Sequence, residues 1–161
     1  MRVRVAGLLV AGLAVTLVLG ACGDGDEERL SQAQFVAEGN RICAQTRQVV
    51  DQAAETAFPN RGNVPTAEEI QRFADDTLVP QLKRELDELK DLNPPEDEEE
   101  DVKEIIEAGE QAADQTSTRA VLLQNKARSP LNRYAELAGE YGLETCGRLS
   151  DRTQNLLAGI D

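Results

Sequence analysis

Residues 31–57, SQAQFVAEGNRICAQTRQVVDQAAETA, contain the pattern around which the rest of the chain is organised. Apolar or small side chains recur there at alternating spacings of four and three, at Phe35, Gly39, Ile42, Thr46, Val49 and Ala53. This spacing is typical of a helix that packs in a bundle. Cys43 follows Ile42, so its sulfur is expected at the edge of the stripe, within reach of another element. We therefore predict that this helix, capped by Ser31, is the first of an all-α fold.

A second helix is expected after the turn-forming residues 58–65, FPNRGNVP. Thr66 and Glu69 have the spacing of a capping box, which predicts where this helix starts. Its apolar stripe comprises Ile70, Phe73, Ala74, Leu78, Leu82, Leu86 and Leu89. We interpret the phenylalanines of the first two helices as core residues and not as a cofactor site.

Pro80 falls inside the second helix. Proline removes a backbone donor and clashes with the carbonyl four residues earlier, so we expect a kink or break near residues 77–79. One interpretation is a bend that lets a long helix follow its neighbours, and this is the one we prefer. The other is a local widening that opens a cavity. Its lining would be Leu78, Leu82, Ile105, Ile106 and Leu123.

Two more helices complete the predicted bundle. The third begins within the acids at 96–101 and continues to Leu123, and Gly109 with its neighbouring alanines suggests a close approach to another helix. Ser129-Pro130 predict the start of the fourth helix, and Gly142 predicts its end. Residues 31–147 are therefore predicted to form a four-helix bundle, with the second helix kinked. Residues 148–161 form a tail that has the pattern of a short helix.

The N-terminal residues have the outline of a signal peptide. Two arginines within residues 1–4 precede a run at 5–19 in which Thr16 is the only polar side chain, and Leu19-Gly20-Ala21-Cys22 follow. This end resembles the lipobox of bacterial lipoproteins. The resemblance implies cleavage after residue 21, lipid chains such as palmitate on Cys22, and a place on the extracytoplasmic face of the cell membrane. The alternative is an uncleaved transmembrane helix, which would not need small residues before a cysteine.

Under this interpretation residues 22–30 are a lipidated flexible tether, because they are glycine-rich and charged. The other two cysteines of the chain, Cys43 and Cys146, would then meet an oxidising environment in which they can pair. We predict that disulfide; the alternative is two free buried thiols. Such a bond would close a loop of about a hundred residues.

A second resemblance rests on short motifs near these cysteines. Phe35-x-x-x-Gly39-x-x-Ile42-Cys43 and Tyr141-Gly142-Leu143-x-x-Cys146-Gly147 are similar to small exported helical proteins of actinobacteria, which are mostly uncharacterised. The resemblance implies a helical domain closed by a disulfide over residues 31–147. Unlike the simplest members, this chain carries a lipobox and extends beyond the second motif.

The charge of the chain excludes some partners. It holds 30 acidic and 17 basic residues, a formal charge of −13, so nucleic acid is not expected to bind. The acids at 96–101 are interpreted as a solvated run at the N-terminus of a helix, where negative charge meets the positive end of the dipole. A calcium or magnesium site would need oxygens at loop spacing with a turn glycine, which this run lacks. No metal site is predicted.

The sequence offers little for catalysis. It contains no histidine, which removes the usual general base and the Ser-His and Cys-His nucleophile arrangements. If Cys22 is acylated and the other cysteines are paired, no free thiol is left. A carboxylate pair acting on a glycoside stays open, but no two acids stand out from the others. We expect a protein without catalytic residues or cofactor.

Two functions remain after these exclusions. The first is a non-enzymatic interaction or scaffold module of the cell envelope, which would engage an envelope protein through its surface. The alternative is a module that holds a small molecule or lipid between its helices. A cavity near Pro80 would favour the ligand, whereas a filled core with an exposed apolar patch would favour the protein partner.

Overall fold

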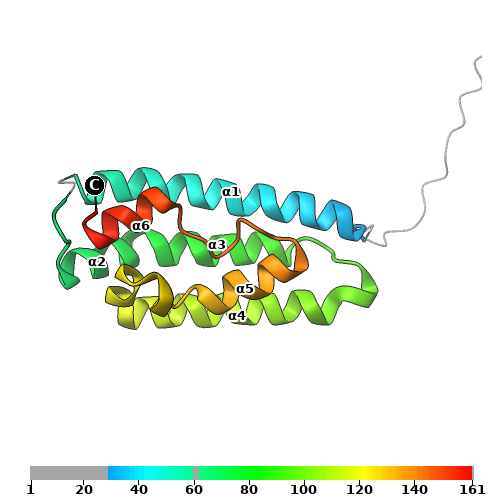
Figure 1. Ribbon diagram of the computed structural model, residues 1–161. Helices are drawn as coiled ribbons and strands as arrows, with labels where there is room; N and C mark the ends of the chain where they lie inside the picture. The colour runs from blue at the N-terminus through cyan, green and yellow to red at the C-terminus, as the bar shows by residue number, and fades with distance from the viewer. Residues whose placement is uncertain (1–28, 60–61, 161) are drawn as a thin grey trace, which may run out of the picture.

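The computed structural model describes residues 29–59 and 62–160, and all regular structure in these residues is helical (Figure 1). The predicted signal peptide, the lipid attachment at Cys22 and most of the predicted tether lie outside the described residues. None of the described helices is both long and apolar enough to span a bilayer. The prediction of an all-α fold is confirmed.

Helix α1 (Gln32–Ala57) is the longest element. Ser31 begins it with a capping box, in which its hydroxyl accepts from the Gln34 N–H and the Gln34 side chain bonds back to the Ser31 backbone. The buried face of α1 consists of Phe35, Gly39, Ile42, Cys43, Val50 and Ala54.

The second half of the predicted α1 stripe is wrong by one residue. Val49 is exposed and Ala53 is half-buried at the edge of the core, whereas Val50 and Ala54 are fully buried. A straight α-helix has 3.6 residues per turn, so it drifts by about 20° per heptad from a strict 3.5-residue stripe. Over the two heptads from Phe35 this drift carries Val49 about 40° away from the direction of Phe35. The packing of neighbouring elements such as α6 against α1 then decides that Val50 and Ala54 face the core.

The second predicted helix consists of three consecutive segments: α2 (Ala67–Phe73), a π-helical segment η1 (Ala74–Leu78) and α3 (Val79–Lys90). Thr66 and Glu69 form the predicted capping box. The chain does not break before Pro80. Instead it widens, because the Val79 N–H bonds to the Ala74 carbonyl, five residues back.

The remaining helices differ from the predictions mainly at their ends. The acids at 96–98 form a 3₁₀ turn, η2 (Glu96–Glu98), before α4 (Glu99–Arg119) begins, and two further 3₁₀ turns follow, η3 (Ala120–Gln124) and η4 (Lys126–Arg128). Helix α5 (Asn132–Tyr141) starts later than Ser129-Pro130 suggested. It ends as predicted at Gly142, which has a left-handed φ of 106°.

Residues 142–150, which we call the strap, connect α5 to a short helix in the tail, α6 (Asp151–Ala158). Helix α3 lies beside α1 and α4, α5 packs on α4, and α6 packs on α1 (Figure 1). The start of α1 and the end of α3 lie at one end of the molecule, and α2 with the end of α6 at the other. Close approach at Gly109 is confirmed, because a Cβ there would collide with Leu86 of α3.

Candidate functional site

The strap is joined to α1 by the predicted disulfide. Cys43 and Cys146 are bonded, with their Cα atoms 4.9 Å apart. They are 1% and 0% exposed, so both sulfurs lie within the core and not at its edge. The alternative of two free thiols is therefore wrong, and the bond closes a loop across 103 residues of sequence.

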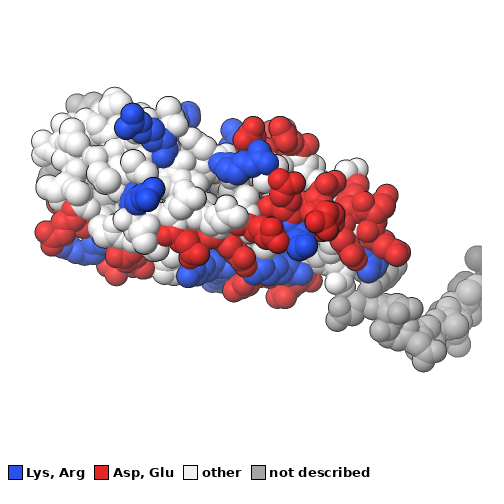
Figure 2. Space-filling model, turned by 90° about the horizontal axis from the view of Figure 1, so that it is seen from below, with Lys and Arg blue, Asp and Glu red and all other residues white. Residues whose placement is uncertain are grey.

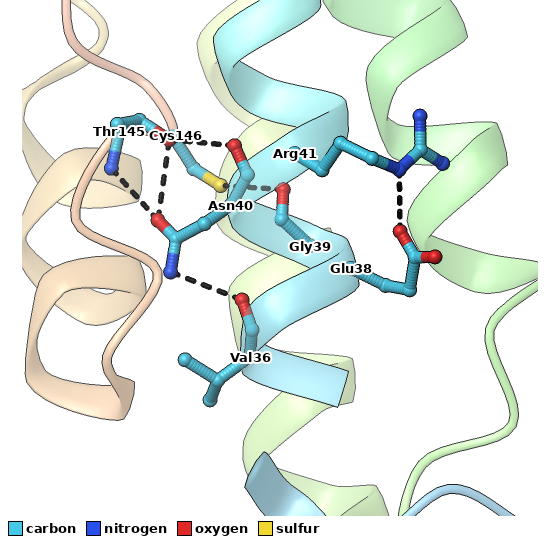
Figure 3. Close-up of polar contacts among 7 residues, drawn as sticks. All are labelled: Val36, Glu38, Gly39, Asn40, Arg41, Thr145 and Cys146. Atoms are coloured by element: carbon cyan, nitrogen blue, oxygen red, sulfur yellow. Dashed lines mark hydrogen bonds and ion pairs between the residues drawn. The ribbon is translucent and has the colours of Figure 1, made fainter. Parts of the chain in front are cut away.

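A polar clasp lies beside the disulfide and is centred on Asn40 of α1 (Figure 3). The Asn40 amide donates to the carbonyl oxygens of Val36, at 3.0 Å, and Gly142, at 2.8 Å. Its Oδ1 accepts from the Thr145 N–H at 3.3 Å and from the Thr145 hydroxyl at 3.2 Å. The Asn40 side chain thus pairs with the Gly142 carbonyl and the Thr145 N–H, two backbone groups in the first half of the strap. Sequence reasoning missed it, because residues 40 and 145 lie far apart in the sequence and meet only in the folded chain.

A buried carboxylic acid faces the disulfide from α3. Glu85 is 3% exposed, and its carboxyl oxygen and the two cysteine sulfurs lie within 4.8 Å of one another. Tyr134 of α5 donates its hydroxyl hydrogen to Glu85 Oε1 at 2.8 Å, and the Thr46 hydroxyl and Gly147 N–H also bond to the carboxyl group. Four separate parts of the chain therefore meet at this acid.

Burial controls the acid–base properties of the pair. Loss of solvent raises the pKa of Glu85 from 4.5 to about 7. The three hydrogen bonds lower this pKa, and the negative charge of nearby Glu88 raises it further, but burial has the largest effect. Burial also raises the pKa of Tyr134 well above its usual value, and the neighbouring carboxyl group adds to this. Glu85 therefore exchanges its proton near neutral pH, whereas Tyr134 keeps its own.

Sequence reasoning missed Glu85 although a signal was present. Leu78, Leu82, Glu85 and Leu89 follow the same four-and-three spacing as the apolar stripe. An acid on such a seam is expected to be buried. Tyr134 is buried on the inner face of α5.

A cavity of about 30 Å³ adjoins Glu85. Leu78 and Leu82 line it as predicted, but Ile105, Ile106 and Leu123 do not. Its other walls include Arg47 of α1 and the strap residues Gly147, Arg148 and Leu149. A volume of this size holds about one or two water molecules and no organic ligand. This cavity beside Glu85 therefore has no room for a ligand.

Larger hollows in the described part of the chain are open to the surface. One of about 410 Å³ lies between the end of α1 and the π-helical segment. Its floor contains Ala53 and Phe73, and its rim carries Glu69, Arg72 and Asp76. The π segment thus coincides with a shallow groove at the surface and not with an internal cavity.

Ligand-type side chains in the described residues gather at one place, namely Cys43, Glu85 and Cys146. Both sulfurs are bonded to each other, so they are not thiolate ligands in this state. The acid run at 96–101, which was predicted to be solvated, lies in a turn and the start of α4 and has no buried member.

Charge is distributed unevenly over the surface. On the face that Figure 2 shows, acidic side chains crowd the end where the described chain begins, and mostly uncharged surface covers the opposite end. The large apolar residues Val64, Val121 and Ile160 are 66%, 44% and 57% exposed. They lie next to α2, on η3 and at the end of α6. These segments contact one another, since the Gln124 side chain of η3 donates to the carbonyl oxygens of Pro65 and Leu157. We call these three residues the distal apolar patch.

No family model, curated protein or solved structure matches this chain significantly. The physical features of the site therefore carry the functional argument. They comprise a buried proton-exchanging acid beside a small cavity, a disulfide-bonded strap, and a surface that is acidic at one end and bears the distal apolar patch at the other.

Proposed function

We propose that the protein is a non-enzymatic interaction module of the cell envelope, held at the extracytoplasmic face of the membrane by lipid on Cys22. The observation that carries this proposal is the distal apolar patch on a domain whose interior has no room for a ligand. A filled core leaves the surface as the place for recognition, and exposed apolar residues on a soluble domain favour a protein partner.

The orientation of the domain supports the same function. Leu30 donates its N–H to the Asn93 carbonyl at 2.8 Å, and Arg29 is paired with Glu99, so the chain enters the domain at the acidic end. With a lipid on Cys22, this acidic end faces the membrane. Anionic headgroups repel it, which holds the domain away from the bilayer and turns the distal apolar patch outward.

The proposal includes the finer architecture predicted from the sequence. In it α1, the combined helix from α2 to α3, α4 and α5 form a four-helix bundle, and the axis of the second helix bends at Pro80. The side-by-side packing of these helices and the π-helical segment just before the proline support it.

The lipid anchor is tested by replacing its attachment residue. Metabolic labelling with a fatty acid is expected to mark the native chain and to leave Cys22→Ala unlabelled and unprocessed. Cys43→Ala is the matched control and should keep the label. Equal labelling of the native chain and the Cys22 variant would contradict the anchor.

The interaction role is tested by the mass of the native lipoprotein, extracted in mild detergent from its own membranes without reductant. We expect a complex with a second protein that is lost in Val64→Asp/Ile160→Asp. Val49→Asp, at an exposed apolar site on α1 outside the patch, should keep the complex. A bare monomer in all three forms, or a complex indifferent to the patch, would contradict this role.

The groove beside the π-helical segment supports one alternative, the binding of a small molecule. In the same mass measurement this alternative predicts a reproducible extra mass of a few hundred daltons in place of a protein partner, which is the range of a ligand that fills such a volume. Arg72→Ala and Asp76→Ala, at the rim of the groove, should then remove the extra mass.

A further inference from the structure

Glu85 lies against the strap, so a change in its charge alters its interactions with the strap residues. Its carboxyl group accepts a hydrogen bond from the Gly147 N–H, and Gly147 follows Cys146 directly. The strap forms one wall of the small cavity, through Gly147, Arg148 and Leu149. Gly147 is half-buried and Arg148 is exposed, so only this thin wall separates the acid from solvent on that side.

The C-terminal half of the strap, residues 147–150, spans two fixed points. At one end the disulfide holds Cys146 to α1. At the other, Asp51 of α1 accepts hydrogen bonds from the hydroxyls of Ser150, at 2.6 Å, and Thr153, at 2.5 Å. Residues between such points can move locally while both helices stay in place.

The groups around Glu85 treat its two charge states differently. Tyr134 from α5 keeps its proton, Arg47 from α1 and Arg148 from the strap carry positive charge beside the cavity, and Glu88 on the same helix carries negative charge. Burial favours the neutral carboxyl group and outweighs the three hydrogen bonds, which favour the ionised one. The ionised form therefore gains from water or an arginine, which can approach it through the cavity at the strap.

We propose that Glu85 is a proton-controlled latch: its neutral form closes residues 147–150 over the disulfide, and its ionised form admits water and loosens them. The disulfide keeps the rest of the strap in place in both states. Near neutral pH the protein therefore changes the accessibility of its C-terminal segment without unfolding.

The sign of the effect follows from where the proton binds more tightly. The closed state holds the Glu85 proton up to about pH 7, whereas an opened, solvated carboxyl group loses it near 4.5. Opening therefore becomes easier as pH rises, by about tenfold per unit between about pH 5 and pH 7, and levels off above that.

Amide hydrogen exchange of the oxidised protein tests the latch. After correction for the intrinsic rate, protection of residues 147–150 should fall across this pH range, while protection of α4 stays constant. Glu85→Gln, which cannot ionise, should show no fall. Asp87→Asn, which removes an exposed acid from the same helix, should behave like the native protein.

Two outcomes would overturn the latch: pH-independent protection in the native protein, or the same fall in Glu85→Gln. Should Glu85→Gln fail to fold, titration of the native Glu85 carboxyl carbon by NMR decides the question. A midpoint near 7 that coincides with the loss of protection supports the latch. A midpoint below 5, or one without any change in the strap, contradicts it.

Discussion

Gly39 shows how much one residue contributes to this core. It lies on the buried face of α1, and a Cβ built there would lie 2.5 Å from a methyl group of Leu143 and 3.3 Å from one of Leu89. Both leucines are themselves buried, so they have little room to move away. The absence of a side chain at residue 39 therefore lets the strap and α3 approach α1 together.

Gly39→Ala is expected to destabilise the protein by about 1–3 kcal/mol, because overpacking of the core outweighs the better helix propensity of alanine. The free energy of unfolding in urea measures the effect. Gly139→Ala is the matched control, since a Cβ there meets only the flexible end of Arg148 at 3.0 Å. It should be neutral or stabilising by up to about 1 kcal/mol. A similar loss in both variants would contradict the argument.

At the scale of an element, the helix from α2 to α3 shows how a chain adapts to an internal proline. Pro80 has no N–H, and in a regular α-helix its ring would meet the carbonyl of Asp76. The π-helical segment places one extra residue in the preceding turn, which moves that carbonyl away. Buried residues on both sides of the segment, such as Phe73 and Leu82, keep facing the core.

The start of the same helix depends on its cap. Thr66→Ala removes the hydroxyl that accepts from the Glu69 N–H, and we expect a loss of about 1 kcal/mol in the free energy of unfolding. Thr56→Ala, an exposed threonine whose hydroxyl bonds back to Gln52 within α1, should change stability by less than about 0.5 kcal/mol. Equal effects would show that the cap contributes nothing specific.

At the scale of the whole molecule, the disulfide ties the first helix to the last third of the chain. Without it, α1 would be joined to the strap by side-chain packing, the Asn40 clasp and the Ser150–Asp51 hydrogen bond. The bond restricts the unfolded chain more than the folded one, since it closes a long loop that is otherwise free to expand.

Cys43→Ala/Cys146→Ala should therefore lower the free energy of unfolding by up to about 4.7 kcal/mol, the value for a loop of about one hundred residues. Urea unfolding of the oxidised protein, the reduced protein and the double variant measures this. The reduced and double-variant proteins should behave alike. If reduction leaves the unfolding curve unchanged, the bond does not stabilise the fold in this way.

The sequence by itself determined the helical class, the start of the second helix and the partners of the disulfide. Local rules suffice for these features: apolar residues recur at helical spacing, and Thr66 and Glu69 satisfy each other within one turn. The prediction that Cys22 carries lipid leaves Cys43 and Cys146 as the pair that the structure shows bonded. The end of α4 and the start of α5 differ from the prediction, because 3₁₀ turns replace α-helix between them.

Only the tertiary structure decided which residues form the site. Whether Val49 or Val50 is buried depends on helical drift and on the packing of α6 against α1. The burial of Glu85 depends on Tyr134, Thr46 and Gly147, which come from three other parts of the chain. The pKa of a carboxyl group depends on all the groups around it. No local sequence pattern could therefore single out Glu85, among the 30 acidic residues of the chain, as the one with a pKa of about 7.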